Sequence, residues 1–295
     1  MTSREDRWVD AIVLVVSSII LVLVLYPLIY IVSASFSDPK LVMSGDVFLL
    51  PKQASFEGYR QIFEYKPIWI GYRNTLFYTA AGTLLNLLFT IPCAYALSRR
   101  DFAGRNALMF LFVFTMFFSG GLIPTYLVVQ QLGLINTVWV LLIPKAVNVW
   151  NLIIARTFFQ TTIPNELKDA AFIDGCSNFK LFVKIIIPLS APIIVVMTLF
   201  YAVYHWNAFF DALIYLSEFR LYPLQLILRN ILIMDQLVDM MGADSDALEQ
   251  IIRRLELREA MKYGIVVVSS LPVLVLYPFL QKYFVKGVMI GSIKG

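Results

Sequence analysis

The chain has 295 residues, of which 59% are hydrophobic and only 15% are charged, and its net charge is +4. Soluble domains average about 45–50% apolar and 25% charged residues, so a soluble protein of this composition would lack the polar side chains to cover its surface. The composition therefore predicts a membrane protein, and the small net charge gives no indication of a nucleic-acid partner.

The two cysteines, Cys93 and Cys176, form no CxxC pair, and the single histidine, His205, cannot complete a metal site with them. We therefore expect no disulfide framework, no metal site and no catalytic site of this kind.

Long charge-free stretches predict membrane-spanning helices, because about 20 consecutive apolar residues cross the hydrocarbon core. The first stretch lies between Asp10 and Asp38, and it is too long for a cleaved signal peptide. The second lies between Arg73 and Arg99. The stretch from Asn106 to Pro144 is too long for one helix. We predict four further spans, over residues 107–130, 137–159, 185–213 and 262–284.

Lysine and arginine in the short connections predict the orientation, because they accumulate on the cytoplasmic side. They gather after the second span, after the fourth span and in the tail, which places both termini in the cytoplasm. The longer connections, residues 38–71 and 217–261, are then expected to face outward. The basic residues that carry this prediction are Arg99, Arg100, Arg105, Lys168, Lys180, Lys184, Lys282, Lys286 and Lys294.

Residues 165–188 form a polar segment between the fourth and fifth predicted spans. Asn165 is expected to cap a first helix, and Gly175 to end it at a turn that a side chain would obstruct. A second short helix is expected to lead into Pro188. The segment is therefore predicted to be a helix-turn-helix beneath the membrane, with an exposed face that could dock another protein.

This segment resembles the coupling motif of binding-protein-dependent ABC importer permeases, which reads E-A-A, three residues, G, nine residues, I-x-L-P. Here Asp169-Ala170-Ala171 precede Gly175 at that spacing, and Ile185 and Pro188 follow. Asp169 and Ile187 replace Glu and Leu conservatively. Over nearly the whole chain the sequence is similar to the carbohydrate-uptake branch, and within it to the maltose-type second permease subunit and the subgroup for complex oligosaccharides. The segments that carry this likeness are GGLIPTYLVVQQLGLINT, HWNAFFDALIYL, LYPLQLIL and FVKGVMIGSIKG.

The resemblance implies an all-α polytopic membrane protein with six transmembrane helices and a cytoplasmic coupling helix-turn-helix. Residues 1–295 would form a single permease domain with core helices over about 72–284. The implied partners are a second homologous permease, an ATPase dimer that binds ATP and Mg, and an extracytoplasmic solute-binding protein that delivers a sugar or oligosaccharide. The implied location is the bacterial inner membrane.

The chain has no G-x-x-x-x-G-K-[ST] phosphate loop, so we expect no ATP site and no cofactor of its own. Glu166 and Asp169 could pair with basic residues of the ATPase or merely complement the helix dipole. The residues implied to couple to the ATPase are Glu166, Asp169, Ala170, Ala171, Asp174, Gly175 and Pro188.

Polar and aromatic residues in the fifth span suggest a sugar path, because aromatic faces stack on sugar rings and amides and carboxylates bond hydroxyl groups. The same residues could instead lie at the membrane interface. They are Tyr201, Tyr204, His205, Trp206, Asn207 and Asp211.

Lys145 lies inside the fourth predicted span. It could extend outward to the interface, or face the cavity and favour an anionic sugar such as a uronate oligomer. Asn148 and Asn151 could contact substrate or hydrogen-bond between helices.

Two other classes of protein fit less well. A secondary transporter would need ion-coordinating carboxylates within its spans, and an intramembrane enzyme would need a catalytic arrangement of side chains. Asp211 is the one acidic residue inside a predicted span, and neither class explains the coupling motif. An ABC importer for a non-sugar solute remains as the alternative.

Overall fold

The computed structural model describes residues 4–238, 261–275 and 278, and the regular structure of these residues is entirely helical, as predicted. The chain divides into two compact units, Met1–Trp69 with Ile227–Pro272 and Ile70–Leu226 with Val273–Gly295. Parts of the predicted sixth span and of the outer connection 217–261, and the C-terminal tail, lie outside the described residues.

The first unit begins with α1 (Arg4–Ser35), an apolar helix long enough to cross a membrane. None of its most apolar window is buried within the protein, as expected for a helix surrounded by lipid. Two short helices follow, α2 (Pro39–Met43) and α3 (Glu57–Glu64). A small core at the end of α1 contains Ala34, Val42, Val47 and Tyr263.

The second long helix, α4 (Lys66–Ser98), corresponds to the second predicted span. It continues through Pro92 without a break. These two helices correspond to the first two predicted spans.

The prediction of one continuous helix over residues 107–130 is wrong. The structure has α5 (Arg105–Phe117) and α6 (Leu122–Gln131), which are bent by 117° relative to each other. The break contains Gly120 and Gly121, and Gly121 has φ of +83°, a conformation that side chains disfavour.

The predicted helix over residues 137–159 is also interrupted. A short 3₁₀ turn, η1 (Val138–Leu141), is followed by a non-helical stretch from Leu142 to Asn148, and the helix α7 covers only Val149–Thr162. Pro144 lies in the non-helical stretch, and the Asn148 side chain caps α7 by accepting a bond from the Asn151 N–H.

The predicted fifth span is divided in the same way. A helical segment through Leu189 and α11 (Ala191–Asn207) are bent by 78°, and α12 (Phe210–Tyr215) begins after a second break. In the described part of the chain, two helices are long enough to cross a membrane, or four if each bent pair is one span, so the predicted count of six is not reached by continuous helices there. The remaining helical elements are η3 (Phe219–Leu221), α13 (Leu224–Val238) and the helix Met261–Val275.

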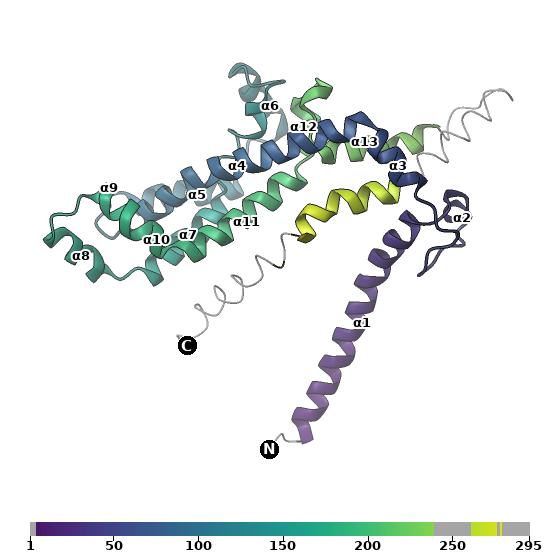
Figure 1. Ribbon diagram of the computed structural model, residues 1–295. Coiled ribbons are helices and arrows are strands. Elements are labelled where there is room, and N and C mark those ends of the chain that lie inside the picture. The colour runs from purple at the N-terminus through teal and green to yellow at the C-terminus, as the bar shows by residue number, and fades with distance from the viewer. Residues whose placement is uncertain (1–3, 239–260, 276–277, 279–295) are drawn as a thin grey trace. The chain divides into compact units, whose positions relative to one another are not determined.

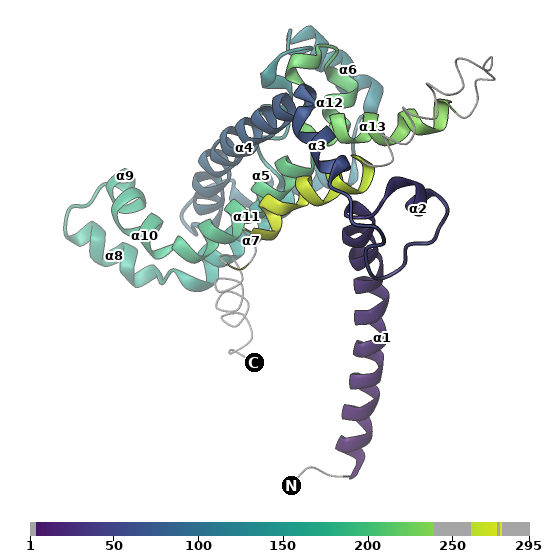
Figure 2. The same ribbon diagram turned by 45° about the vertical axis from the view of Figure 1, so that its right-hand side comes forward.

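The second unit is built around α4, α7 and α11, which run alongside one another (Figures 1 and 2). The predicted helix-turn-helix lies at one end of these helices, and α6 and α12 lie at the other. The core that joins α4, α7, α11 and the helix-turn-helix includes Ala94, Leu97, Leu152, Ala155, Phe159, Leu181, Ile186 and Met197.

Candidate functional site

The helix-turn-helix follows its prediction closely. Its first helix is α8 (Asn165–Ile173), and its second begins with α9 (Asn178–Leu181). A π-turn, η2 (Phe182–Ile186), then continues into α10 (Ile187–Leu189), which contains Pro188. The predicted cap is wrong, because α8 begins at Asn165 and its cap position is Pro164.

Gly175 lies in the turn between α8 and α9 with φ of +71°. A Cβ at this position would meet nothing within 4 Å. Glycine is therefore suited to this turn by its backbone conformation, and not by the lack of space that the sequence suggested.

One face of the helix-turn-helix packs against the chain itself. Ala171 and Leu181 are buried in the core shared with α4 and α7. Ala171 is thus directed inward, although the motif implied a coupling role for it. The other six residues of the predicted coupling set are exposed: Glu166, Asp169, Ala170, Asp174, Gly175 and Pro188.

Two large apolar side chains on the opposite face were missed by the sequence reasoning. Ile173 is 87% exposed and Phe179 is 77% exposed, one on each side of the turn. Exposed apolar groups of this size on a polar segment are typical of a protein contact. In the sequence, these two apolar residues flank the turn glycine Gly175 within a polar segment, and this pattern could have indicated a contact surface at the turn.

A cluster of four polar side chains ties the helix-turn-helix to the end of α4, and we call it the Asp101 clasp. Asp101 accepts two bonds from Arg99, at 3.1 and 2.6 Å, and pairs with Lys168 of α8 at 2.8 Å. Arg99 also donates to Asn178 Oδ1 of α9 at 2.5 Å. The bonds from Arg99 and then Lys168 hold the pKa of Asp101 well below its usual range, so the carboxylate stays charged.

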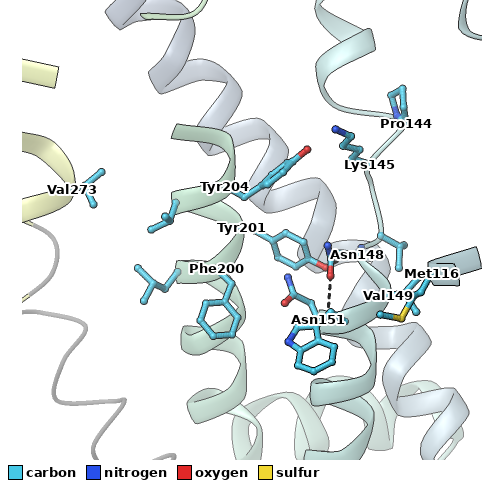
Figure 3. Close-up of a pocket in the computed structure, with 14 residues that line it drawn as sticks. Met116, Pro144, Lys145, Asn148, Val149, Asn151, Phe200, Tyr201, Tyr204 and Val273 are labelled. Atoms are coloured by element: carbon cyan, nitrogen blue, oxygen red, sulfur yellow. Dashed lines mark hydrogen bonds between the residues drawn. The ribbon is translucent and has the colours of Figure 1, made fainter. Parts of the chain in front are cut away.

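A cavity of about 1170 Å³ lies in the second unit. Five of the predicted path residues line it: Lys145, Asn148, Asn151, Tyr201 and Tyr204. The remaining wall is apolar and aromatic and includes Met116, Val147, Trp150, Phe200 and Val273 (Figure 3).

The non-helical stretch before α7 forms part of this wall, and a side chain of α4 holds it in place. Asn86 Nδ2 donates to the carbonyl oxygens of Lys145 and Ala146, at 2.7 and 2.9 Å. Since the amide nitrogen makes these bonds, Asn86 Oδ1 is the acceptor, and His205 Nε2 donates to it at 2.7 Å. Irregular backbone in membrane proteins is tolerated where it lines a cavity, and Pro144, Lys145, Val147 and Asn148 of this stretch do so.

Lys145 does not extend away from the protein. Its Nζ pairs with Asp211 Oδ2 at 2.5 Å and lies 5.7 Å from the centre of the Tyr204 ring. Figure 3 shows Lys145 and Tyr204 directed toward each other from the two sides of the cavity. The pair thus joins the interrupted fourth span to α12, the segment that follows the break in the fifth.

The other three predicted path residues lie away from the cavity wall. His205 and Trp206 are buried, and His205 packs on α4 at Gly82, where a Cβ would lie 2.4 Å from its Nε2. Asn207 is exposed at the end of α11 and donates to the Val203 carbonyl. Asn86 and Gly82 were missed, because their roles depend on contacts with residues far away in the sequence: Lys145 and Ala146 are 59 and 60 positions from Asn86, and His205 is 119 positions from it.

Within the described residues, no group of three or more His, Cys, Asp or Glu side chains is placed to hold a metal ion. Both cysteines are half-buried and unpaired.

The sequence matches no family model. The chain is 42% identical over 269 residues to the polygalacturonan/rhamnogalacturonan transport system permease protein YtcP of Bacillus subtilis, covering 91% of this chain and 92% of that protein. It is 28% identical over 279 residues to the arabinooligosaccharides transport system permease protein AraQ of Halalkalibacterium halodurans, covering 92% and 91%. It is also similar to a chain in the crystal structure of a bacterial ABC transporter involved in the import of the acidic polysaccharide alginate, with a TM-score of 0.85, 35% identity, and coverage of 96% and 99%.

Proposed function

This chain belongs to the ABC transporter permeases of sugar and oligosaccharide uptake systems, and from that premise we propose that it forms half of the membrane pathway of an ATP-driven importer. A second, homologous permease supplies the other half. An extracytoplasmic solute-binding protein delivers the cargo to the outer face. The chain lies in the bacterial inner membrane with its termini and helix-turn-helix in the cytoplasm.

The energy comes from partner subunits. The sequence has no phosphate-binding loop, so ATP and Mg bind to a separate ATPase dimer. ATP favours one arrangement of that dimer, and a permease docked to it is shifted toward the matching arrangement of its membrane helices.

The observation that carries the proposal is the exposed face of the helix-turn-helix. Ile173 and Phe179 are large exposed apolar groups on a short polar segment, whose exposed polar residues include Glu166, Asp169, Asp174 and Lys180. Apolar anchors within a polar rim are typical of a docking surface. The opposite face is packed into the helix core, so a displacement of the segment is passed directly to α4 and α7.

We propose an acidic oligosaccharide as the cargo. YtcP is named for polygalacturonan and rhamnogalacturonan, and the solved transporter imports alginate. The cavity lies slightly above the range of roughly 300–1,000 Å³ typical of small-molecule pockets, which suits a sugar oligomer. Its Tyr and Trp rings offer faces for sugar rings, its two asparagines offer hydrogen bonds, and Lys145 offers a cation for a carboxylate.

The docking surface is tested with Ile173→Ser in the reconstituted complex of both permeases, the ATPase and the binding protein. In the native complex, we expect binding protein loaded with cargo to stimulate ATP hydrolysis. In the variant, that stimulation should be at least about tenfold smaller, or the ATPase should dissociate from the complex, as expected when a hot-spot residue is truncated. The matched control is Ile123→Ser, since Ile123 is 73% exposed on α6 at the other end of the unit. Equal stimulation in Ile173→Ser and native complexes would contradict the proposal.

A further inference from the structure

Lys145 is partnered in this structure by a carboxylate of the same chain. We infer that Asp211 is an internal competitor for the cargo: it holds Lys145 when the cavity is empty, and a carboxylate of an acidic oligosaccharide replaces it during transport. This inference rests on the proposed function and assigns to the Lys145–Asp211 pair the discrimination between acidic and neutral sugars.

The position of the lysine supports this role. Its backbone is fixed, because Asn86 holds the carbonyl groups of Lys145 and Ala146 and is itself held by His205. Its side chain remains 51% exposed and lines the cavity, whereas the Asp211 side chain is 19% exposed. The cation is therefore presented to the cavity from a rigid support, and Asp211 approaches it from one side.

The need of Lys145 for an opposite charge explains why a cargo carboxylate could replace Asp211. An ammonium group at membrane depth is costly without an opposite charge, so Lys145 requires a partner in every state of the cavity. Asp211 meets that requirement in the empty state. A uronate carboxylate meets it equally well, while a neutral sugar offers only hydroxyl groups and leaves the pair intact.

The two partners lie on separate pieces of the interrupted spans. Lys145 precedes α7, and Asp211 follows the break between α11 and α12. Replacement of Asp211 therefore removes a link between these pieces in step with cargo entry. When the cargo leaves, Asp211 returns to Lys145, which prevents the cation from retaining an anionic sugar.

The test compares two trisaccharides that differ at the C6 groups, galacturonotriose (carboxylates) and galactotriose (hydroxymethyl groups). Binding of each is measured by titration calorimetry on the assembled transporter in lipid nanodiscs, without the binding protein. Asp211→Asn removes the competitor but preserves shape, so galacturonotriose should bind roughly fivefold tighter or more. Galactotriose should change by less than about twofold, because it does not compete for the lysine.

A double variant, Lys145→Gln with Asp211→Asn, removes both charges and leaves no unpaired ion. We expect it to bind the two trisaccharides equally, whereas the native protein favours galacturonotriose. Weaker binding of both sugars by Asp211→Asn would show a merely structural pair and overturn the inference, as would an acidic preference that survives in the double variant. If the native complex binds neither sugar, the inference fails, while the importer function is judged separately by the Ile173→Ser assay.

Discussion

At the scale of single residues, Gly82 is the glycine, among those in the described part of the chain, where an added Cβ would meet its neighbours most closely. A Cβ there would lie 2.4 Å from His205 Nε2 and within 2.7 Å of two other atoms of the ring. The ring cannot easily move aside, because it is buried and bonded to Asn86, which in turn supports the cavity wall at Lys145. Gly82 thus supports the cavity without touching it.

We therefore expect Gly82→Ala to destabilise the folded protein by about 1–3 kcal/mol, the usual cost of overpacking a tight contact. The measurement is the thermal midpoint of the purified complex, followed by fluorescence. Gly120→Ala is the matched control, because its new Cβ would meet Pro124 at an ordinary 3.5 Å. Equal losses for both variants would mean that the His205 contact is not the cause.

At the scale of elements, the Asp101 clasp joins three helices through one carboxylate. Asp101 bonds Arg99 at the end of α4 and Lys168 on α8, and Arg99 extends to Asn178 on α9. The apolar core already attaches the helix-turn-helix to α4 and α7. We therefore expect the clasp to fix the angle of the helix-turn-helix relative to α4, and not to be needed for its attachment.

Asp101→Asn should therefore leave the ATPase bound while reducing the stimulation by loaded binding protein about two- to fivefold, since half-exposed ion pairs contribute only roughly 0.2–1 kcal/mol each. Lys168→Ala should have a similar effect, and the double variant should be little worse than either single one. Asp46→Asn, an exposed carboxylate of the first unit, serves as the control. Fully additive effects would show that Asp101 and Lys168 act separately.

The pH dependence of the clasp follows from the depressed pKa of Asp101. A carboxyl with a lowered folded pKa contributes stability that is complete above its unfolded value of about 3.9 and is lost only as the pH falls through the folded pKa. Between pH 6 and 8 the clasp is fully charged. The ratio of stimulated ATPase rates in native and Asp101→Asn complexes should therefore be constant over that interval, and a ratio that drifts toward one at pH 6 would contradict this account.

The elements also show what the sequence could predict. The helix-turn-helix was predicted because its signals are local: a glycine at the turn and a proline near the end of the second helical segment, which the structure places inside α10. The interrupted spans were not, because an apolar stretch reads the same whether it is one helix or two. Gly121 and Pro144 are residue types that often interrupt helices. The path of residues 142–148, however, depends on Asn86 of α4, a contact that no local pattern reveals.

At the scale of the whole molecule, the two ends of the second unit have different chemistry. Basic side chains gather at the end that carries the helix-turn-helix, which is typical of the cytoplasmic side. Both ends have exposed apolar groups, such as Ile123 and Leu132 at the α6 end, but the exposed Arg220 at the α6 end is paired with Glu218. The basic residues at the first end are Arg99, Arg100, Arg105, Lys168 and Lys180.

This asymmetry predicts the orientation of the chain. In a background with Cys93 and Cys176 replaced by serine, a membrane-impermeant maleimide should label Gln131→Cys in intact spheroplasts but label Ala103→Cys only after lysis. Both positions are exposed and neither lies on the proposed ATPase-docking face, so access to the reagent and not burial decides the outcome. Labelling of Ala103→Cys in intact spheroplasts would place this end of the unit, and the helix-turn-helix with it, outside the cytoplasm, where it could not contact an ATPase.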